Sequence, residues 1–382
     1  MSGLEGEVSE EDPCFDWPLA AVGRACGLLD MALGFAAHLK PLAQHRFFTK
    51  GWGDLQILQD GRLFMDDFVA DYQKGVSPPK VALGPERSVF QGSGVCCRGT
   101  FPSPLASYLP EESKLCEFEL LQPKNRQPWA CVIQFPGTAD QSYLFRKLTV
   151  ASPLLQQGVA SVLITPAFYG NRRPKQQILH YIDKVSDFCL QSEAVLLEAL
   201  QVLDWLKMKF PNACLGCTGI SWGGAMASCM GFLAQRHDLA VLPCLPSANP
   251  EVLITGALRG EVALDCLAAG GLQVNEAESL LRGVLCAMST ETLQQMEIPG
   301  PVGHKVVLQV SAFYDTFVDK QASKLVFRSL RHLDSGAQLS WVASGHASSH
   351  AAGRFLFAAP VLSGLHRLSR QRQGSAPVLS KL

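Results

Sequence analysis

Residues 214–227 constrain the fold of this chain more than any other stretch, because they contain Gly219-Ile220-Ser221-Trp222-Gly223. A short apolar run before this pattern predicts a buried strand, and the small residues of 224–232 predict a helix packed close to a sheet. A serine at a sharp strand-to-helix turn projects as a nucleophile beside free helix amides, and glycines leave room for such a turn. The stretch therefore predicts a nucleophile elbow, with a simple glycine-rich turn as the alternative interpretation.

The strands predicted around this element form a mostly parallel sheet. Ala130–Phe135 and 160–164 are continuous apolar runs with helical spacing between them, which is typical of two parallel strands joined by a helix. The preceding segment 86–121 alternates in polarity and predicts an antiparallel start to the sheet. We therefore predict an α/β fold with a mostly parallel central sheet flanked by helices and a helical cap inserted before the acid-bearing strand at 306–312.

At 382 residues the chain is long enough for two average domains, but we expect a single main domain. Residues 1–80 are predicted to form an N-terminal tail and an amphipathic helical extension. Residues 81–370 are predicted to form the main domain, with the cap at about 255–297. The polar and basic residues 371–382 are predicted to be a disordered tail.

The N-terminal segment Trp17–Leu39 is mostly apolar but contains Arg24 and Asp30. Each charge would cost about 2.5–3.5 kcal/mol at a bilayer centre, so an amphipathic helix is favoured over a spanning one. The acidic residues before it argue against a secretory signal or a mitochondrial presequence. A product starting at Met31 would lack early acids and carry several basic residues, so a mitochondrial location stays open.

Composition excludes some partners and indicates a compartment. The net charge of −1 gives no global attraction to nucleic acid, so no nucleic-acid partner is expected. Thirteen cysteines, mostly in apolar runs, indicate an intracellular, reducing compartment, either cytoplasmic or peripheral on a membrane. Cys214 and Cys217 form a C-x-x-C, but they fall on the predicted strand without a second ligand pair of zinc spacing. We therefore predict no metal site and no cofactor.

An acid and a base follow late strands in the order that serine hydrolases of this kind use. Asp315 comes three residues after the predicted strand 306–312, and His346 comes three residues after the predicted strand 338–343. A serine nucleophile needs such a base, and the base needs an acid to orient it. We therefore predict Ser221, Asp315 and His346 as a catalytic triad.

Both predicted partners of the serine have a competitor nearby. Asp319 is the rival acid and His350 is the rival base. Both are expected inside the helices that follow, too far along the chain to turn back to the site.

The remaining requirement is a pair of donors for the oxyanion that forms during acyl transfer. One predicted donor is the backbone N–H of Trp222, directly after the serine. The other should come from the loop after the strand that ends at Phe135. Pro136 has no N–H, so Gly137 or Thr138 is the predicted donor. A plain Pro-Gly turn is the alternative interpretation of this loop.

Several motifs besides the elbow give the chain a family resemblance over roughly residues 29–368. The chain resembles the alpha/beta-hydrolase-domain-containing protein 18 family at these places, in order: Lys50-Gly51-Trp52-Gly53, Pro136-Gly137-Thr138-Ala139-Asp140, Phe168-Tyr169-Gly170-Asn171-Arg172-Arg173-Pro174, Thr218-Gly219-Ile220-Ser221-Trp222-Gly223-Gly224 and Gly345-His346-Ala347-Ser348. The resemblance implies an α/β-hydrolase fold and a serine nucleophile, with Ser221, Asp315 and His346 as the triad. It also makes lipid acyl esters a reasonable substrate class.

We expect a serine hydrolase, esterase-like or lipase-like, that cleaves carboxylic esters through an acyl-enzyme. The substrate is a lipid ester or a small-molecule ester, and peripheral membrane association is compatible with the N-terminal helix. The cap is rich in leucine, valine and alanine, which predicts either an acyl channel or plain core packing. A catalytically silent scaffold used for binding, and a small-molecule esterase or thioesterase, are the alternative functions.

Overall fold

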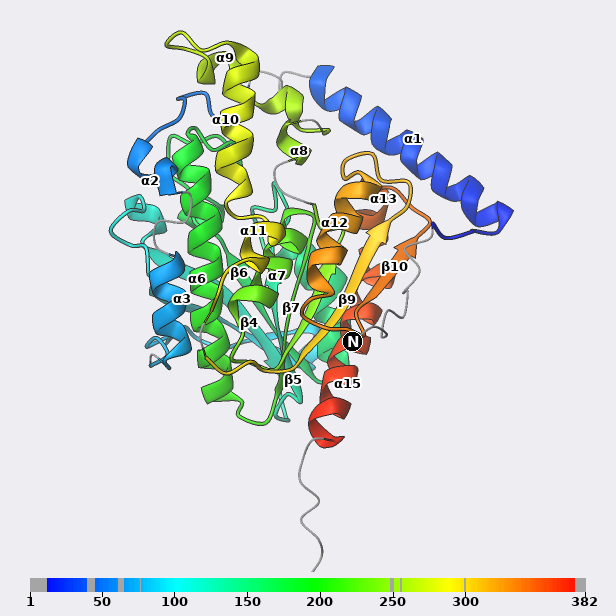
Figure 1. Ribbon diagram of the computed structural model, residues 1–382. Helices are drawn as coiled ribbons and strands as arrows, with labels where there is room; N and C mark the ends of the chain where they lie inside the picture. Colours follow the sequence, from blue (N-terminus) through cyan, green and yellow to red (C-terminus); the bar gives the residue numbers. More distant parts are fainter. Residues whose placement is uncertain are drawn as a thin grey trace, which may run out of the picture.

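A large mixed sheet with helices on both faces forms the body of the protein (Figure 1). The computed structural model describes these parts of the chain: residues 12–39, 45–60, 65–75, 77–247, 251–254, 256–298 and 300–374. The strand order is β1-β3-β4-β6-β5-β7-β8-β9-β10, with β2 paired to β3. The acidic N-terminal residues 1–11 and most of the predicted C-terminal tail, residues 375–382, lie outside the described residues.

The sheet begins with antiparallel strands, as the alternating polarity predicted. These strands are β1 (Ala82–Leu83), β2 (Arg87–Val89), β3 (Gly94–Pro102) and β4 (Leu115–Pro123). β3 pairs antiparallel with β1, β2 and β4, and β4 continues antiparallel onto β6. This hairpin region forms one edge of the sheet.

The rest of the sheet is parallel, and it carries the candidate site. Its strands are β5 (Ala130–Phe135), β6 (Val159–Thr165), β7 (Cys214–Ile220), β8 (Leu239–Cys244), β9 (Lys305–Ala312) and β10 (Gln338–Val342). All pairs among them are parallel. Every residue of β5 to β9 is buried, which is why these strands are mostly apolar rather than alternating between apolar and polar residues. The predicted fold class is confirmed.

Successive side chains of a strand enter two different cores. Cys131 and Ile133 pack into the core beneath α6 and α7, whereas Ala130 and Val132 pack into the core beneath α15. The flanking helices are α2 (Leu55–Asp60), α3 (Met65–Gln73), α4 (Leu144–Arg146), the π-helix η4 (Lys147–Ala151), α5 (Ser152–Gln156), α6 (Val185–Lys209), α7 (Trp222–Leu233), α12 (Lys320–Leu330), α13 (His346–Ala351), α14 (Gly353–Leu356) and α15 (Ala358–Gly374). Helix α15 runs on to Gly374, further than the start of the predicted tail at Gln371.

Short helices lie between β8 and β9, at the end of the sheet where the parallel strands finish (Figure 1). They are α8 (Glu251–Ile254), α9 (Leu264–Leu267), α10 (Val274–Cys286) and α11 (Thr290–Gln294). The sequence predicted an almost continuous helical segment here. The chain instead turns at Gly270 and Gly271, whose φ angles of 109° and 110° suit glycine and end the helix before them.

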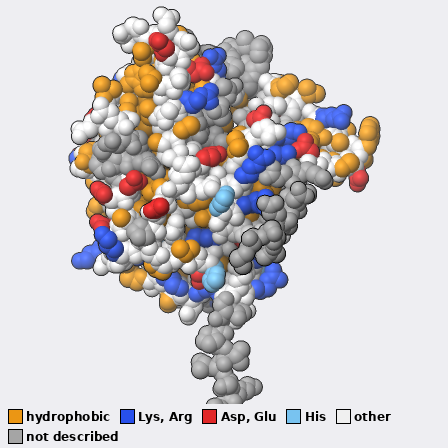
Figure 2. All heavy atoms as spheres, in the orientation of Figure 1, with side chains coloured by type: hydrophobic (Ala, Val, Ile, Leu, Met, Phe, Trp, Pro, Cys, Tyr) orange, Lys and Arg blue, Asp and Glu red, His pale blue; other side chains and the backbone are white. Residues whose placement is uncertain are grey.

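Helix α1 (Trp17–Leu39) crosses the outside of the molecule beside α12 and α13 (Figure 1). Within residues 17–32 of this helix, the buried residues are Gly23, Gly27 and Asp30, whereas the side chains of Trp17 and Leu28 are 82% and 65% exposed. The predicted helix is therefore present, and within residues 17–32 its small and acidic residues face inward and its large apolar residues face outward, as Figure 2 shows along its outer side. No helix in the described ranges is both long and apolar enough to cross a bilayer.

Candidate active site

Ser221 lies at the turn between β7 and α7, where its backbone has φ 60° and ψ −120°. A residue with a side chain rarely adopts a positive φ, and such a conformation costs on the order of 1–3 kcal/mol. Hydrogen bonds hold it: the Ser221 N–H donates to the Cys244 carbonyl at 3.0 Å, and the Ser221 carbonyl accepts from the Ala225 N–H at 3.0 Å. Strand β8 and helix α7 together fix the serine on a strained elbow.

The flanking glycines of the elbow are required by close backbone contacts. A Cβ on Gly219 would lie 2.4 Å from the carbonyl carbon of Gly223, and a Cβ on Gly223 would lie 2.6 Å from the carbonyl oxygen of Phe135. No side chain fits at these distances, so both positions need glycine. The same contacts bring the end of β5 against the first turn of α7, directly beside Ser221.

Asp315 and His346 meet as a hydrogen-bonded pair after β9 and β10. His346 Nδ1 lies 2.7 Å from Asp315 Oδ2, and both side chains are largely buried. The other carboxylate oxygen, Asp315 Oδ1, accepts from the N–H groups of Phe317 and Val318, each at 2.8 Å. A carboxylate can only accept, so this network places the imidazole hydrogen on Nδ1 and leaves Nε2 as an acceptor. That tautomer is the one a general base needs.

The imidazole is also held by its surroundings. The Phe317 ring stacks on His346, with centroids 5.2 Å apart and planes 25° from parallel. Within the described residues, Ser221 Oγ makes no hydrogen bond to an imidazole. Such bonds are often long in the absence of substrate and tighten in the complex.

The loop after β5 passes beside Ser221, where the predicted oxyanion donors lie. A Cβ on Gly137 would be 4.0 Å from Ser221 Cβ, and Thr138 lines a small cavity together with Ser221 and Trp222. Trp222 is the first residue of α7, so its N–H has no partner within the helix. The structure therefore brings the predicted donors to the serine, on the two sides of the elbow.

Tyr169 supports this loop, although it was not among the site residues predicted from the sequence. Ala139 has φ 68°, and its backbone N–H bonds to the Tyr169 hydroxyl. Burial raises the pKa of this hydroxyl, and the hydrogen bond from Ala139 opposes the rise. The ring centroids of Tyr169 and Trp222 are 6.2 Å apart, so Tyr169 links both sides of the candidate oxyanion site. Its place in a motif after β6 was the only sequence signal for it.

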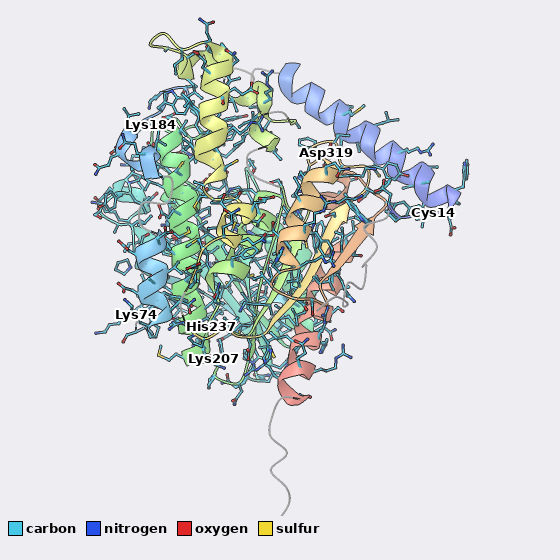
Figure 3. All side chains as sticks on the ribbon, viewed as in Figure 1. Cys14, Lys74, Lys184, Lys207, His237 and Asp319 are labelled. Atoms are coloured by element: carbon cyan, nitrogen blue, oxygen red, sulfur yellow. The ribbon has the colours of Figure 1, made fainter. Side chains whose placement is uncertain are left out.

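Asp319, the rival acid, has a hydrogen-bond partner other than His346. Asp319 lies at the start of α12 (Figure 3), where its side chain caps the helix by accepting from the Gln321 N–H. It makes no hydrogen bond to His346 within the described residues, whereas Asp315 does. The geometry favours Asp315 as the acid.

The rival base is closer to the site than the sequence suggested. The expectation that His350 lies too far along its helix is wrong, because α13 begins at His346 and one turn brings the two rings to the same side. Their centroids are 5.3 Å apart, and His350 Cε1 is 3.8 Å from the point where a Gly137 Cβ would lie. Burial, followed by the charge of His346, lowers the pKa of His350 to about 4.

This shift predicts an acid-sensitive stability. The unfolded chain protonates His350 near its ordinary pKa of 6.5, but the folded protein resists protonation down to about 4, so stability is lost as pH falls through this window. His350→Gln should therefore lose about 2 kcal/mol less unfolding free energy than wild type between pH 7 and pH 5. Urea unfolding at both pH values measures this, with the exposed His332→Gln as the matched control. Equal losses in wild type and His350→Gln would contradict it.

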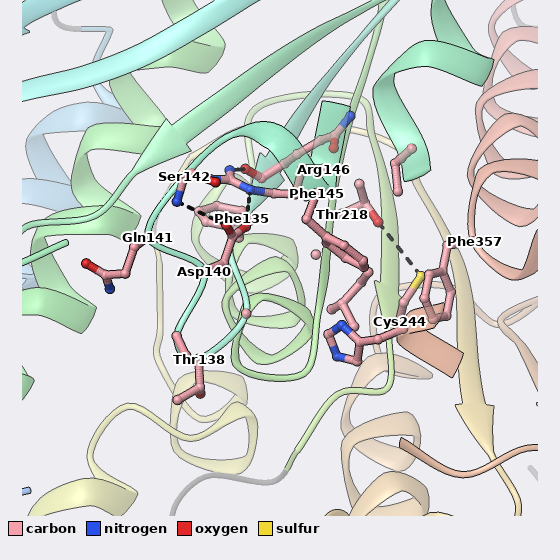
Figure 4. Close-up of a pocket in the computed structure, with 17 residues that line it drawn as sticks. Phe135, Thr138, Asp140, Gln141, Ser142, Phe145, Arg146, Thr218, Cys244 and Phe357 are labelled. Atoms are coloured by element: carbon pink, nitrogen blue, oxygen red, sulfur yellow. Dashed lines mark hydrogen bonds and ion pairs between the residues drawn. The ribbon is translucent and has the colours of Figure 1, made fainter. Parts of the chain in front are cut away.

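Two cavities are lined in part by the loop after β5. The larger has a volume of about 410 Å³ and is drawn in Figure 4. Its walls include Gly137 and Thr138 of the loop, His350, and these apolar side chains: Phe135, Phe145, Val150, Ile220 and Phe357. Arg146 forms part of its rim, held by Asp140 at 2.7 Å and by the carbonyls of Gln134 and Ile164 (Figure 4).

The smaller cavity is lined by Ser221 and by residues of the region between β8 and β9. Its volume is about 30 Å³, and Val252, Leu253 and Leu258 line it. Of these three, only Leu258 was among the apolar cap residues predicted to line a channel. The other predicted residues lie elsewhere: Val262, Leu267, Leu281 and Leu285 are core residues, Val284 is partly buried against the core, and Leu280 is exposed. The cap's apolar content is thus mainly core packing.

Cys214 and Cys217 lie buried on β7. The Cys217 thiol donates to the Ala227 carbonyl at 3.4 Å. In the parts of the chain that the structure describes, no cluster of His, Cys, Asp and Glu side chains has the arrangement of a metal site.

A parallel sheet, a strained serine elbow after β7, an acid after β9 and a base after β10 define a protein of the α/β-hydrolase fold. The family described as alpha/beta hydrolase domain containing 18 matches residues 45–280, and the chain belongs to this family. The resemblance found in the sequence is confirmed.

Solved structures share the fold. Acetyl xylan esterase 1 from Thermoanaerobacterium sp. JW/SL YS485 is similar with a TM-score of 0.53 at 14% identity, covering 83% of this chain and 96% of that one. An acetyl xylan esterase from Paenibacillus sp. R4 is similar with a TM-score of 0.53 at 16% identity, covering 79% of this chain and 98% of that one. At these identities the likeness concerns the fold.

Proposed function

We propose that the protein is a serine hydrolase that cleaves carboxylic esters through an acyl-enzyme. The observation that carries this proposal is the Asp315–His346 hydrogen bond of 2.7 Å on a fold that also holds Ser221 on a strained elbow. A silent scaffold would keep the turn at the serine but has no need of a buried acid oriented on an imidazole. Both similar structures are named as esterases, which agrees with ester chemistry.

In this mechanism Ser221 Oγ attacks the ester carbonyl carbon while His346 Nε2 takes the hydroxyl proton. Asp315 stabilises the imidazolium that forms, and the N–H groups of Trp222 and of Gly137 or Thr138 bind the oxyanion. The C–O bond to the alcohol breaks as His346 returns the proton to the leaving oxygen. Water, deprotonated by His346, then attacks the acyl-enzyme and releases the acid and free Ser221.

The proposed substrate class is lipid acyl esters. The cavity of about 410 Å³ beside the loop after β5 is within the size range of small-ligand sites, and its wall combines apolar side chains such as Phe145 and Phe357 with polar ones such as Arg146. The apolar part of this wall suits an acyl chain, because burying apolar surface stabilises by about 25 cal/mol per Å².

The outer side of α1 is the proposed membrane-facing surface. Trp17, Val22 and Leu28 are 82%, 58% and 65% exposed, and Arg24 is the exposed charge among the described side chains of the helix. An apolar helix face of this kind favours the interfacial region of a bilayer, where tryptophan is well placed.

The thirteen described cysteines are all free, which supports a reducing intracellular compartment.

Hydrolysis of a series of esters tests the substrate class. We expect kcat/KM to rise with acyl length and to rise further when the ester is presented in vesicles. Trp17→Ser combined with Leu28→Ser should lower vesicle activity several-fold while turnover of a short soluble ester stays unchanged. Val302→Ser, which changes a side chain that is 74% exposed near the start of β9, is the matched control. If short soluble esters are turned over best and the double variant matches wild type on vesicles, a small-molecule esterase remains.

A further inference from the structure

Helix α1 is seated on the candidate site by its inner side. Asp30 is 0% exposed although it is an acid on a surface helix. A buried carboxylate is costly unless it is hydrogen-bonded, so its partners must account for its position. Burial raises the pKa of Asp30, and the backbone N–H groups that it accepts from oppose the rise.

The partners of Asp30 are the first two residues of the helix that carries the base. One carboxylate oxygen accepts from the His346 N–H, and the other accepts from the Ala347 N–H at 3.0 Å. These donors have no partner within α13 itself, because they lie in its first turn. Asp30 therefore acts as an N-terminal cap that is supplied from a different helix, 316 residues away in the sequence.

The space for this carboxylate depends on a glycine next to the base. A Cβ on Gly345 would lie 2.2 Å from Asp30 Oδ2, so any side chain at position 345 would displace the carboxylate. The Gly-His pair after β10 thus serves two purposes, since its histidine carries the imidazole and its glycine admits the cap.

The same helix contacts the loop that carries the acid. A Cβ on Gly23 would lie 2.3 Å from the Tyr314 ring, and a Cβ on Gly27 would lie 2.9 Å from the Tyr314 carbonyl oxygen. Before the helix, Asp12 forms ion pairs with Lys320 and Lys324 of α12, each at 3.0 Å. Helix α1 is therefore in contact with the residue before Asp315 and with the backbone of His346.

We propose that Asp30 is a positioning residue for the base, and that the inner side of α1, made of Gly23, Gly27 and Asp30, holds it in place. The inference rests on the proposed function, because it takes Asp315 and His346 as the acid and base. Loss of the cap leaves two N–H groups without an acceptor and frees the first turn of α13, which sets the place of His346 Nε2 relative to Ser221. A displacement of about 1 Å at such a site lowers turnover by about 10²-fold.

Three full-length variants test the proposal on a short soluble ester, for which membrane docking plays no part. Asp30→Ala should lower kcat by about 10²-fold and leave KM within about 2-fold, because Asp30 acts through the base and does not contact substrate. Asp30→Asn should fall between Asp30→Ala and wild type, since its amide keeps one acceptor oxygen. Gly23→Leu keeps Asp30 but forces α1 off Tyr314, and it should resemble Asp30→Ala. Arg24→Gln, which removes an exposed charge from the same helix, is the matched control and should match wild type.

The low-field proton resonance of the His346 Nδ1–H···Asp315 bond provides a second readout that a general loss of stability would not move. This resonance is absent by definition in His346→Ala, and it should be lost in folded Asp30→Ala and kept in Arg24→Gln. Wild-type kcat in Asp30→Ala, or in Asp30→Asn and Gly23→Leu if Asp30→Ala does not fold, overturns the proposal. If wild type neither hydrolyses esters nor reacts with a fluorophosphonate, the proposed function is wrong. In that case the proton resonance alone decides whether Asp30 positions His346.

Discussion

Ser221→Ala is expected to lower kcat for ester hydrolysis by about 10⁶-fold while the protein stays folded. The loss is large because the serine, the base and the acid act as one unit, so removing the nucleophile leaves only binding and the oxyanion donors. Alanine removes a hydroxyl that makes no hydrogen bond within the described residues, and it keeps the Ser221 backbone bonds to Cys244 and Ala225. Steady-state kinetics on a soluble ester, together with thermal unfolding, measure both parts of this prediction.

Ser247 offers a matched control for that experiment, because it lines the same small cavity as Ser221. Ser247→Ala should keep kcat within about 10-fold of wild type, since Ser247 does not lie on the elbow. A reversed order of effects would move the nucleophile to Ser247. Unchanged kcat in Ser221→Ala would remove the acyl-enzyme mechanism altogether.

Asp315→Asn should have the next largest effect, a loss in kcat of about 10⁴-fold with the fold retained. An amide at this place can turn its NH₂ group toward His346 Nδ1. The imidazole hydrogen then moves to Nε2, where the base has to accept the proton of Ser221. Charge stabilisation of the imidazolium is lost as well, because the amide is neutral.

Asp319→Asn is the matched control for the acid, since it makes the same chemical change four residues further along. Its carboxylate caps α12 through the Gln321 N–H, so we expect a small loss of stability and kcat within a few-fold of wild type. Pre-steady-state kinetics of both variants at neutral pH separate acylation from deacylation. A larger loss in Asp319→Asn than in Asp315→Asn would move the acid to Asp319.

The fold could be predicted from the sequence because its strands are buried on both faces. Continuous apolar runs such as Ala130–Phe135 have few alternatives to a parallel strand, and the residues after them identify the carboxyl edge of the sheet. The break between the short helices of the region between β8 and β9 could not be predicted, because the apolar spacing of this region is helical throughout. The glycines at 270 and 271 turn the chain there, with φ angles outside the helical range.

The pairing of Asp315 with His346 could be predicted because their order along the chain and their places after strands are fixed by the fold. Asp30 could not be found in this way, since its contact with His346 spans nearly the whole chain and no local pattern encodes it. In the sequence, Asp30 is recognisable only as a charge that interrupts an apolar helix. His350 was misjudged for a local reason, because the start of α13 at His346 sets which residues share a side of the helix.

The position of the larger cavity could not be predicted from the sequence either. Its walls come from β5 and the loop after it, helix α4, strands β7 and β8, helix α13 and Phe357, which are far apart along the chain. The apolar cap residues gave the more visible signal, but most of them pack in the core.

The central claim, that Ser221 is a nucleophile activated by His346 and Asp315, is tested most directly by labelling with a fluorophosphonate probe. The activated Oγ displaces fluoride from the probe and forms a stable phosphonyl ester, and an unactivated serine does not react at a comparable rate. The account predicts stoichiometric labelling of wild type at Ser221, strongly slowed labelling of Asp315→Asn and none of Ser221→Ala. Equal labelling of wild type and Ser221→Ala would contradict it.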